Sequence, residues 1–255
     1  MFIDTHTHLF SDVFDEDRDQ VIQRAIQSGV ELCLLPNIDV DTIDAMHELE
    51  LKYPENCHSM MGLHPGSVGE DWKNKLDIIK TNLFSREYIA VGEIGMDLYW
   101  DKTYIDAQRE VFAQQVRWAK ELKIPVVIHA RSAFQEIYEV LDVLDDENLS
   151  GVFHCFTGTL DDANKIAEYH NFKLGIGGVL TYKNAKLDRV IKQIPLDQLI
   201  LETDSPYLPP TPHRGKRNES SYLLHVAEKL ADVYGLPLQE IEKQTTETAK
   251  KLFKL

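Results

Sequence analysis

Two histidines, His6 and His8, lie two residues apart in the stretch FIDTHTHL, which covers residues 2–9. Taken alone, such a pair is as consistent with polar residues at a strand end as with a binding site. Four more side chains of metal-ligand type each stand where an apolar run gives way to polar sequence. They are Glu93, His129, His154 and Asp204. Because imidazole and carboxylate groups bind divalent cations, the six residues together predict a site for one or two metal ions.

Hydrolysis is the chemistry that such a site predicts. A bound cation lowers the pKa of its water towards neutrality, so a metal-bound hydroxide is the expected nucleophile. With two ions, we expect Glu93 to bridge them, and Asp204 to bind metal and to take a proton from the water. Two divalent cations would also give the six ligands a net positive charge, which attracts an anionic substrate.

Each of four further residues near these positions has both a functional and a structural interpretation. Glu202 could orient a ligand histidine, or form an internal ion pair. His64, in GLHP, could contact substrate or cap a strand end. Arg131 could reach a phosphate or pair with a surface carboxylate. Arg214 belongs to the basic stretch TPHRGKRNES, which suits phosphate recognition over the site or a solvated charge cluster. The other histidines, expected at the surface or in packing, are His47, His58, His170, His213 and His225.

The predicted ligands are far apart in the sequence, so the fold has to bring several strand ends together. Eight short β-rich runs recur, over 2–9, 31–38, 58–65, 88–95, 124–131, 151–156, 172–180 and 199–204. Most intervals carry helical periodicity, for example Leu223 to Tyr234, which Gly235 would end. Strands alternating with helices predict an α/β fold, a (β/α)8 TIM barrel that forms one domain over residues 1–255. An open doubly wound sheet is disfavoured, because no glycine-rich phosphate loop follows the first strand.

Within a strand, side chains alternate between the two faces, so His6 and His8 should point the same way, into the barrel. Gly175, Gly177 and Gly178, in the seventh run, would leave room rather than supply ligands.

Composition narrows the class of protein. The chain has 255 residues, 43% of them hydrophobic, with a net charge of −15. An acidic exterior disfavours a broad nucleic-acid-coating surface, although it allows a small, locally positive site. No basic region followed by an apolar stretch predicts a leader or a membrane span. Cys33, Cys57 and Cys155 form no CxxC pair, which suits a reducing compartment, and we expect a cytoplasmic protein without an obligate protein partner.

An ordered series of motifs runs along nearly the whole chain. It consists of DTHTHL from Asp4, GLHP from Gly62, VGEIGMD from Val91, PVVIHAR from Pro125, HCFTG from His154, ETDSPYL from Glu202 and HRGKRNE from His213. With this series the sequence resembles the TatD family of metal-dependent deoxyribonucleases, among the amidohydrolase-type barrels. The sequence departs from the family pattern at two positions. Leu98 stands where a tyrosine more often follows the aspartate of VGEIGMD, which concerns substrate contacts, and Ser220 stands where a proline often follows RNE, at a helix start.

The resemblance implies a monomeric barrel that hydrolyses DNA phosphodiester bonds with two divalent ions (Mg, Mn or Zn), often as a 3′–5′ exonuclease on single-stranded ends. It implies that His6 and His8 bind one metal with Glu93 and Asp204. It implies that Glu93, His129 and His154 bind the second, and that Asp204 is the catalytic base. His64 and Arg214 resemble the family's substrate-side residues. A small phosphoester is another possible substrate, an amidohydrolase acting on C–N bonds of a small-molecule amide is the alternative enzyme, and a non-enzymatic interaction partner is disfavoured because all six ligands are present.

Overall fold

The computed structural model describes residues 1–169 and 171–255. The strands are β1 (Phe2–Asp4), β2 (Val30–Pro36), β3 (Cys57–Met60), β4 (Val91–Asp97), β5 (Val126–Arg131), β6 (Gly151–Phe153), β7 (Phe172–Ile176) and β8 (Leu199–Leu201). The helices are α1 (Arg18–Gln27), α2 (Ile43–Lys52), α3 (Trp72–Leu83), α4 (Ile105–Leu122), α5 (Phe134–Leu144), α6 (Leu160–Glu168), α7 (Leu187–Ile191), α8 (Leu223–Tyr234) and α9 (Leu238–Phe253). Short single-turn helices include η1 (Asp12–Phe14), η2 (Val40–Thr42), η3 (Pro65–Ser67), η4 (Gly178–Thr181), η5 (Leu196–Gln198) and η6 (Ser220–Tyr222).

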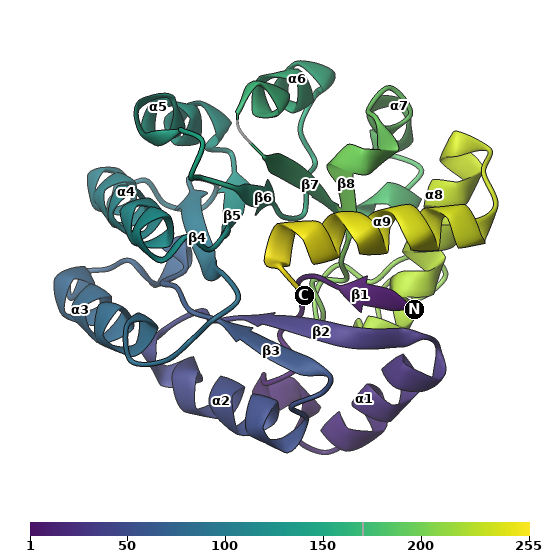
Figure 1. Ribbon diagram of the computed structural model, residues 1–255, viewed down its shortest axis with the longest axis horizontal. Coiled ribbons are helices and arrows are strands. Elements are labelled where there is room, and N and C mark those ends of the chain that lie inside the picture. The colour runs from purple at the N-terminus through teal and green to yellow at the C-terminus, as the bar shows by residue number, and fades with distance from the viewer. Residues whose placement is uncertain (170) are drawn as a thin grey trace.

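The strands close into a barrel. All paired strands run parallel, in the orders β1-β2-β3 and β4-β5-β6-β7-β8. Backbone hydrogen bonds join the two sets: the Gly92 amide donates to the Met61 carbonyl (3.1 Å), and the Thr5 amide donates to the Leu201 carbonyl (3.1 Å). With the helices arranged around this ring (Figure 1), the predicted (β/α)8 barrel is confirmed.

One end of the barrel interior is filled by apolar side chains and covered by α9. The strands, together with the residue just before β4, supply Ile3, Leu34, Met60, Ala90, Val127, Val152 and Ile200, and α9 adds Ala249, Leu252 and Phe253. Figure 1 shows α9 lying across this end of the barrel. Because this end is packed, the polar residues at the carboxyl ends of the strands gather at the opposite end.

The outer helices are amphipathic and pack on the strands. In α8 the buried positions are Leu223, Val226, Ala227 and Leu230, and Gly235 ends the helix in a left-handed conformation, both as predicted. None of the helices in residues 1–169 and 171–255 is long and apolar enough to cross a membrane.

Several strands have other bounds than the sequence predicts. β3, β6 and β8 end at Met60, Phe153 and Leu201, so His64, His154 and Asp204 follow these strands and do not end them. The first and fourth strands differ too. β1 ends at Asp4, so His6 and His8 lie beyond the strand and not on it. The prediction that Glu93 ends the fourth strand is wrong, because β4 continues to Asp97. In both places the pairing is irregular: the register shifts between Phe2 and Ile3 in β1 and between Val91 and Ile94 in β4.

Candidate metal centre

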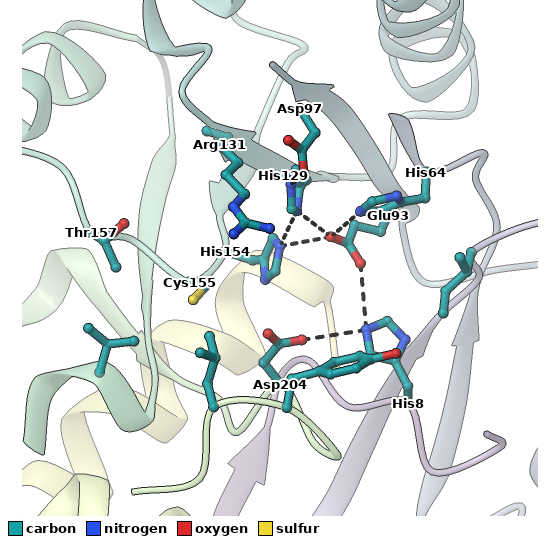
Figure 2. A pocket seen from close by; sticks show the side chains of 15 residues that line it. His8, His64, Glu93, Asp97, His129, Arg131, His154, Cys155, Thr157 and Asp204 are labelled. Atoms are coloured by element: carbon teal, nitrogen blue, oxygen red, sulfur yellow. Dashed lines mark hydrogen bonds and ion pairs between the residues drawn. The ribbon is translucent and has the colours of Figure 1, made fainter. Parts of the chain in front are cut away.

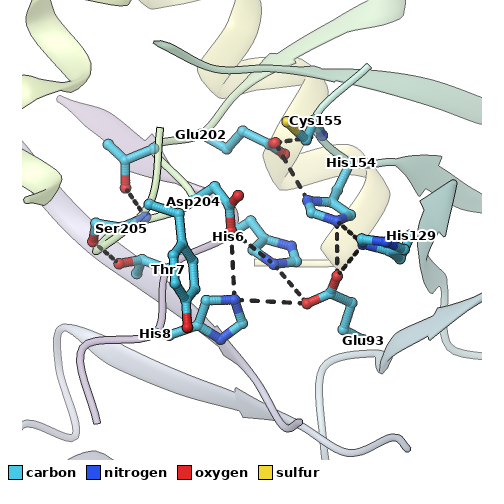
Figure 3. A network of polar contacts seen from close by, with 12 residues as sticks. His6, Thr7, His8, Glu93, His129, His154, Cys155, Glu202, Asp204 and Ser205 are labelled. Atoms are coloured by element: carbon cyan, nitrogen blue, oxygen red, sulfur yellow. Dashed lines mark hydrogen bonds and ion pairs between the residues drawn. The ribbon is translucent and has the colours of Figure 1, made fainter. Parts of the chain in front are cut away.

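Four predicted ligands meet around one point at the mouth of the barrel. The Oε2 atom of Glu93 lies 3.1 Å from His6 Nε2 and 3.6 Å from His8 Nε2. The Oδ1 atom of Asp204 lies 3.8 Å and 3.5 Å from the same two nitrogens. Figure 3 shows the two carboxylates and the two imidazoles facing one another.

A second group shares Glu93 with the first. Its other oxygen, Oε1, lies 2.9 Å from His129 Nδ1 and 2.8 Å from His154 Nε2, and these two nitrogens are 3.3 Å apart. His129 therefore presents Nδ1 and His154 presents Nε2 to the same point (Figures 2 and 3). Glu93 stands between the two groups with one oxygen directed at each.

The spacing of these donors suits small divalent cations. In a tetrahedral site with bonds of 2.0–2.2 Å, neighbouring ligand atoms are roughly 3.3–3.6 Å apart. The distances in the first group, 3.1 to 3.8 Å, span this spacing, and those in the second, 2.8 to 3.3 Å, are shorter and reach only its lower limit. A buried set of imidazoles and carboxylates is costly without such a partner, because each polar group has lost its water. The residues present thus fit one ion in each group.

The loop after β1 and the loop after β8 hold the first group in place. The Asp204 amide donates to the His6 carbonyl (2.9 Å), and the His8 amide donates to the Ser205 carbonyl (2.7 Å). Thr7, between the two histidines, turns the other way, with Oγ1 2.6 Å from the Ser205 hydroxyl. Asp204 has a left-handed backbone with φ of 56°, which a non-glycine residue adopts only where its surroundings impose it.

Glu93 is also fixed through its main chain. Its amide donates to the Asn37 carbonyl (3.1 Å), and the Asn37 side chain donates to the Gly62 carbonyl (2.9 Å). Ala90, just before β4, faces the inner apolar cluster, and Glu93, three residues later and on β4, faces the metal centre. The register shift in β4 makes this spacing possible, since a regular strand alternates faces every residue.

Each histidine of the second group has a carboxylate on its other ring nitrogen. Asp97 Oδ2 lies 3.1 Å from His129 Nε2, and Glu202 Oε1 lies 3.5 Å from His154 Nδ1. Glu202 also accepts a hydrogen bond from the Cys155 amide. A carboxylate in this position holds the proton on the outer nitrogen, so the inner nitrogen is free to bind a cation.

Glycine at position 175 leaves the room that Glu202 occupies. A Cβ atom at Gly175 would lie 2.1 Å from Glu202 Oε2 and 3.1 Å from the Cα atom of His154. The expectation that this glycine supplies space rather than a ligand agrees with this contact.

The charges of the centre are strongly coupled. Burial alone would raise the pKa of Glu93, but the surrounding histidines, led by His154, outweigh it and hold this pKa well below its usual value. Burial likewise lowers the pKa of His154, but Glu93 and Glu202 reverse the effect and set it well above its usual value. The negative potential that keeps a proton on His154 would equally hold a cation.

A cavity of about 540 Å³ opens over the second group and over His8 and Asp204 of the first. Its wall includes His64, whose Nε2 lies 3.3 Å from Glu93 Oε1, and Arg131 (Figure 2). Two of the three predicted substrate-side residues thus line the cavity. His64 also caps η3, because its Nδ1 accepts from the Gly66 amide (2.9 Å), so it has a capping role, at a helix start and not at a strand end, while its contact with substrate stays a prediction.

The basic loop after β8 is less available than the sequence predicts. Arg214 is not among the residues that line the cavity; its guanidinium lies 3.7 Å from the ring centroid of Tyr182. Arg217 is paired with Asp17 (2.6 Å).

Of the other histidines, His213 and His225 are in contact through their Nε2 atoms (3.1 Å) away from the centre, and His170 lies outside the described residues.

Asp97 is the functional candidate that the analysis of the sequence missed. Its position in the sequence could have indicated it, because Asp97 is the last residue of the motif VGEIGMD, from which only Glu93 was predicted as a metal ligand. Its position two residues after Gly95 at the end of β4 places its carboxylate beside His129 on the neighbouring strand.

Comparison with known proteins agrees with this geometry. The family model described as TatD related DNase matches residues 3–254. The chain belongs to this family. Similar relatives of this TatD-family protein are the uncharacterized metal-dependent hydrolases YabD of Bacillus subtilis, 39% identical over the full length of both chains, and YcfH of Escherichia coli, 30% identical over 98% of this chain and 95% of YcfH. The solved structure of the TatD homolog YjjV of Escherichia coli superposes with a TM-score of 0.93, at 30% identity, over 100% of this chain and 98% of YjjV. The protein is thus a metal-dependent hydrolase of the TatD family.

Proposed function

We propose that this TatD-family hydrolase cleaves phosphodiester bonds of DNA, removing nucleotides from the 3′ end of single strands with the help of two divalent cations. The observation that carries the proposal is the division of Glu93, with Oε2 among His6, His8 and Asp204 and Oε1 between His129 and His154. Two cations held in this way would activate a water molecule and offset the charge that develops on a phosphate.

The chain's own residues have distinct parts in this proposal. Asp204 lines the cavity beside His8, so its carboxylate can accept a proton from a water molecule there. Arg131 supplies a permanent positive charge in the same cavity, which suits a phosphate better than a neutral amide. His64 lies between the cavity and Glu93 and can donate a hydrogen bond to a phosphate oxygen.

The shape of the cavity supports action on an unpaired end. A volume of about 540 Å³ is that of a small-molecule pocket, which takes a nucleotide and not a duplex. The scissile phosphate has to reach Glu93 at the base of this cavity, so the strand must enter without its partner.

The test is the shortening of a single-stranded oligonucleotide, labelled at the 5′ end to follow stepwise loss from the 3′ end, in Mg²⁺, Mn²⁺, Zn²⁺ or EDTA. We expect a metal-dependent ladder that is lost in Asp204→Ala and His6→Ala. His58→Ala, on β3 and away from the centre, is the matched control and should keep the wild-type ladder.

Metal content gives a readout that does not depend on activity. Equilibrium dialysis against Mn²⁺ followed by elemental analysis should find two ions per wild-type chain and one in His129→Ala. If the oligonucleotide stays intact in every metal while a panel of cyclic and linear amides is hydrolysed, the proposal is wrong and the enzyme acts on C–N bonds. One ion in the wild type would contradict the two-metal arrangement.

A further inference from the structure

An exposed pair of aromatic residues stands beside the cavity, on the loop between β4 and α4. The side chain of Tyr99 is 54% exposed and that of Trp100 is 79% exposed. Their ring centroids are 4.7 Å apart with perpendicular planes. A tryptophan with most of its surface in water is unusual in a folded chain and marks a surface that binds something.

Arg131 connects this pair to the cavity. Its guanidinium carbon lies 4.1 Å from the Tyr99 ring centroid and 5.6 Å from the Trp100 ring centroid, and Arg131 also lines the cavity wall. The three side chains therefore form one continuous surface, which we call the aromatic shelf, leading out of the cavity. It combines a cation with two π faces.

The aromatic shelf is held at a fixed place relative to the metal centre. Asp97 accepts a hydrogen bond from the Tyr99 amide through Oδ1 (3.0 Å), and its Oδ2 lies 3.1 Å from His129 Nε2. Further along the loop, Asp101 accepts from the Thr103 amide (2.8 Å) and closes the turn. One carboxylate thus positions both a metal-ligand candidate and the first residue of the shelf.

On another side of the mouth, a groove between η1–α1 and α2 would repel nucleic acid. It adjoins the cavity at Ile38, which lines both. Its walls carry Asp12, Asp15, Glu16, Asp19, Asp41 and Glu48 against two cations, Arg18 and Lys52. These cations are already paired, Arg18 with Asp15 and Lys52 with Asp19. A polyanion that reaches the metal centre is therefore directed away from this groove and towards Arg131.

We propose that the aromatic shelf is a subsite for an unpaired nucleobase, which stacks on the exposed Trp100 ring with Tyr99 at its edge, while Arg131, held over the Tyr99 ring, contacts the adjoining phosphate. This inference rests on the proposed function and names residues that would favour a base-bearing single strand. Stacking on an aromatic side chain tolerates any base, because every base has a π face. The subsite would thus contribute affinity without sequence preference.

Two oligonucleotides of equal length separate base recognition from phosphate recognition. One is an oligothymidylate, and the other carries base-free tetrahydrofuran nucleotides at its last three positions. We expect Trp100→Ala to raise KM roughly 10-fold on the oligothymidylate, with Trp100→Phe between it and the wild type. Neither variant should change KM on the base-free strand. Leu51→Ala, at a position 76% exposed on α2, is the control and should match the wild type on both.

Fluorescence keeps this test separate from that of the proposed function. A phosphorothioate oligothymidylate, which resists hydrolysis, should quench the tryptophan emission of the wild type but not that of Trp100→Phe, in which Trp72 and Trp118 remain. An equal rise in KM on both oligonucleotides in Trp100→Ala, or quenching that persists in Trp100→Phe, would overturn the proposed shelf while leaving the proposed nuclease activity intact. Base-dependent quenching without any cleavage would support the shelf and refute the nuclease.

Discussion

Glu93 acts through its two oxygens separately, and this division explains why its surroundings are so specific. One oxygen lies among His6, His8 and Asp204 and the other between His129 and His154. Removing either oxygen would therefore take the shared carboxylate ligand from one group, because the remaining oxygen cannot serve two points. Asp97 and Glu202 lie at the outer ring nitrogens of His129 and His154. Substituting them should disturb the centre less than substituting Glu93, so their variants tell more about the centre.

Replacing Asp97 by asparagine should weaken metal binding without unfolding the chain. The amide keeps an acceptor for the Tyr99 amide but no longer holds the proton on His129 Nε2 through a full negative charge. Loss of such a supporting carboxylate typically costs 10- to 100-fold in metal affinity, and about that decrease is expected for one of the two ions. Titration calorimetry with Mn²⁺ measures it. Asp106→Asn, exposed at the start of α4, is the control, and equal affinities in both variants would contradict the role of Asp97.

At the scale of elements, α1 and η6 are joined by an ion pair whose strength should depend on pH. Both carboxylate oxygens of Glu219 accept from Arg24, at 2.9 and 2.6 Å. Burial alone would raise the pKa of Glu219, but Arg24 and Ser221 outweigh it and lower the pKa below its usual value. Because the folded pKa is the lower one, the pair stabilises the fold above the unfolded pKa of about 4.3 and loses this effect as pH falls through the folded pKa.

Glu219→Gln should therefore lower the free energy of unfolding by about 1 kcal/mol at pH 7. The difference from the wild type should shrink as the pH falls from the unfolded pKa of about 4.3 through the lower folded pKa of Glu219, below which both proteins carry an uncharged side chain. Urea unfolding at several pH values measures this. A difference that is the same at every pH would show that the charge of Glu219 is not involved.

The last helix makes a prediction about packing. Phe253 is 3% exposed and belongs to the apolar cluster that fills the barrel end under α9. Phe253→Ala should cost about 3 kcal/mol of stability, since it leaves a cavity there. Leu255→Ala, at a position 38% exposed, should cost little. Denaturant unfolding measures both, and metal content per folded chain should stay unchanged because the metal centre lies at the other end.

The elements show which parts of the fold could be predicted from sequence. His129 and His154 lie two residues after the interior Val127 and Val152, so simple alternation places them correctly. His6 and Glu93 break this rule, because each lies three residues after an interior residue, Ile3 or Ala90. Glu93 is reoriented by the irregular pairing between Val91 and Ile94, and His6 lies in the loop beyond the end of β1. Both features depend on neighbouring strands and leave no local pattern.

No helix is predicted from the sequence over the residues of α9, and the reason is a different one. Its buried face includes Thr245, Thr246 and Thr248, whose hydroxyls donate to the carbonyls of Ile241, Met1 and Gln244. A polar residue that satisfies its own hydroxyl on nearby main chain can be buried, so the apolar periodicity is incomplete. The partner of Arg217 was equally hidden, since Asp17 lies 200 residues away in the sequence.

At the scale of the whole molecule, the net charge of −15 confines attraction to the mouth of the barrel. Affinity for a single strand should therefore depend weakly on salt, with a slope of about −1 for the logarithm of the binding constant against that of the salt concentration. Extending the strand beyond a few nucleotides should add little. Fluorescence anisotropy with phosphorothioate strands of different lengths measures both. A slope of about −4 would mean that many phosphates contact the protein, against the distribution of charge.

The packed barrel end under α9 has a consequence for how a single strand would move through the enzyme under the proposed function. A strand cannot thread through the barrel, because apolar side chains from the strands and from α9 fill that end. The shortened strand and the released nucleotide have to share the mouth that admitted them. A nuclease built in this way is expected to be distributive, letting go of the strand between successive cuts, with a rate set by exchange at the mouth.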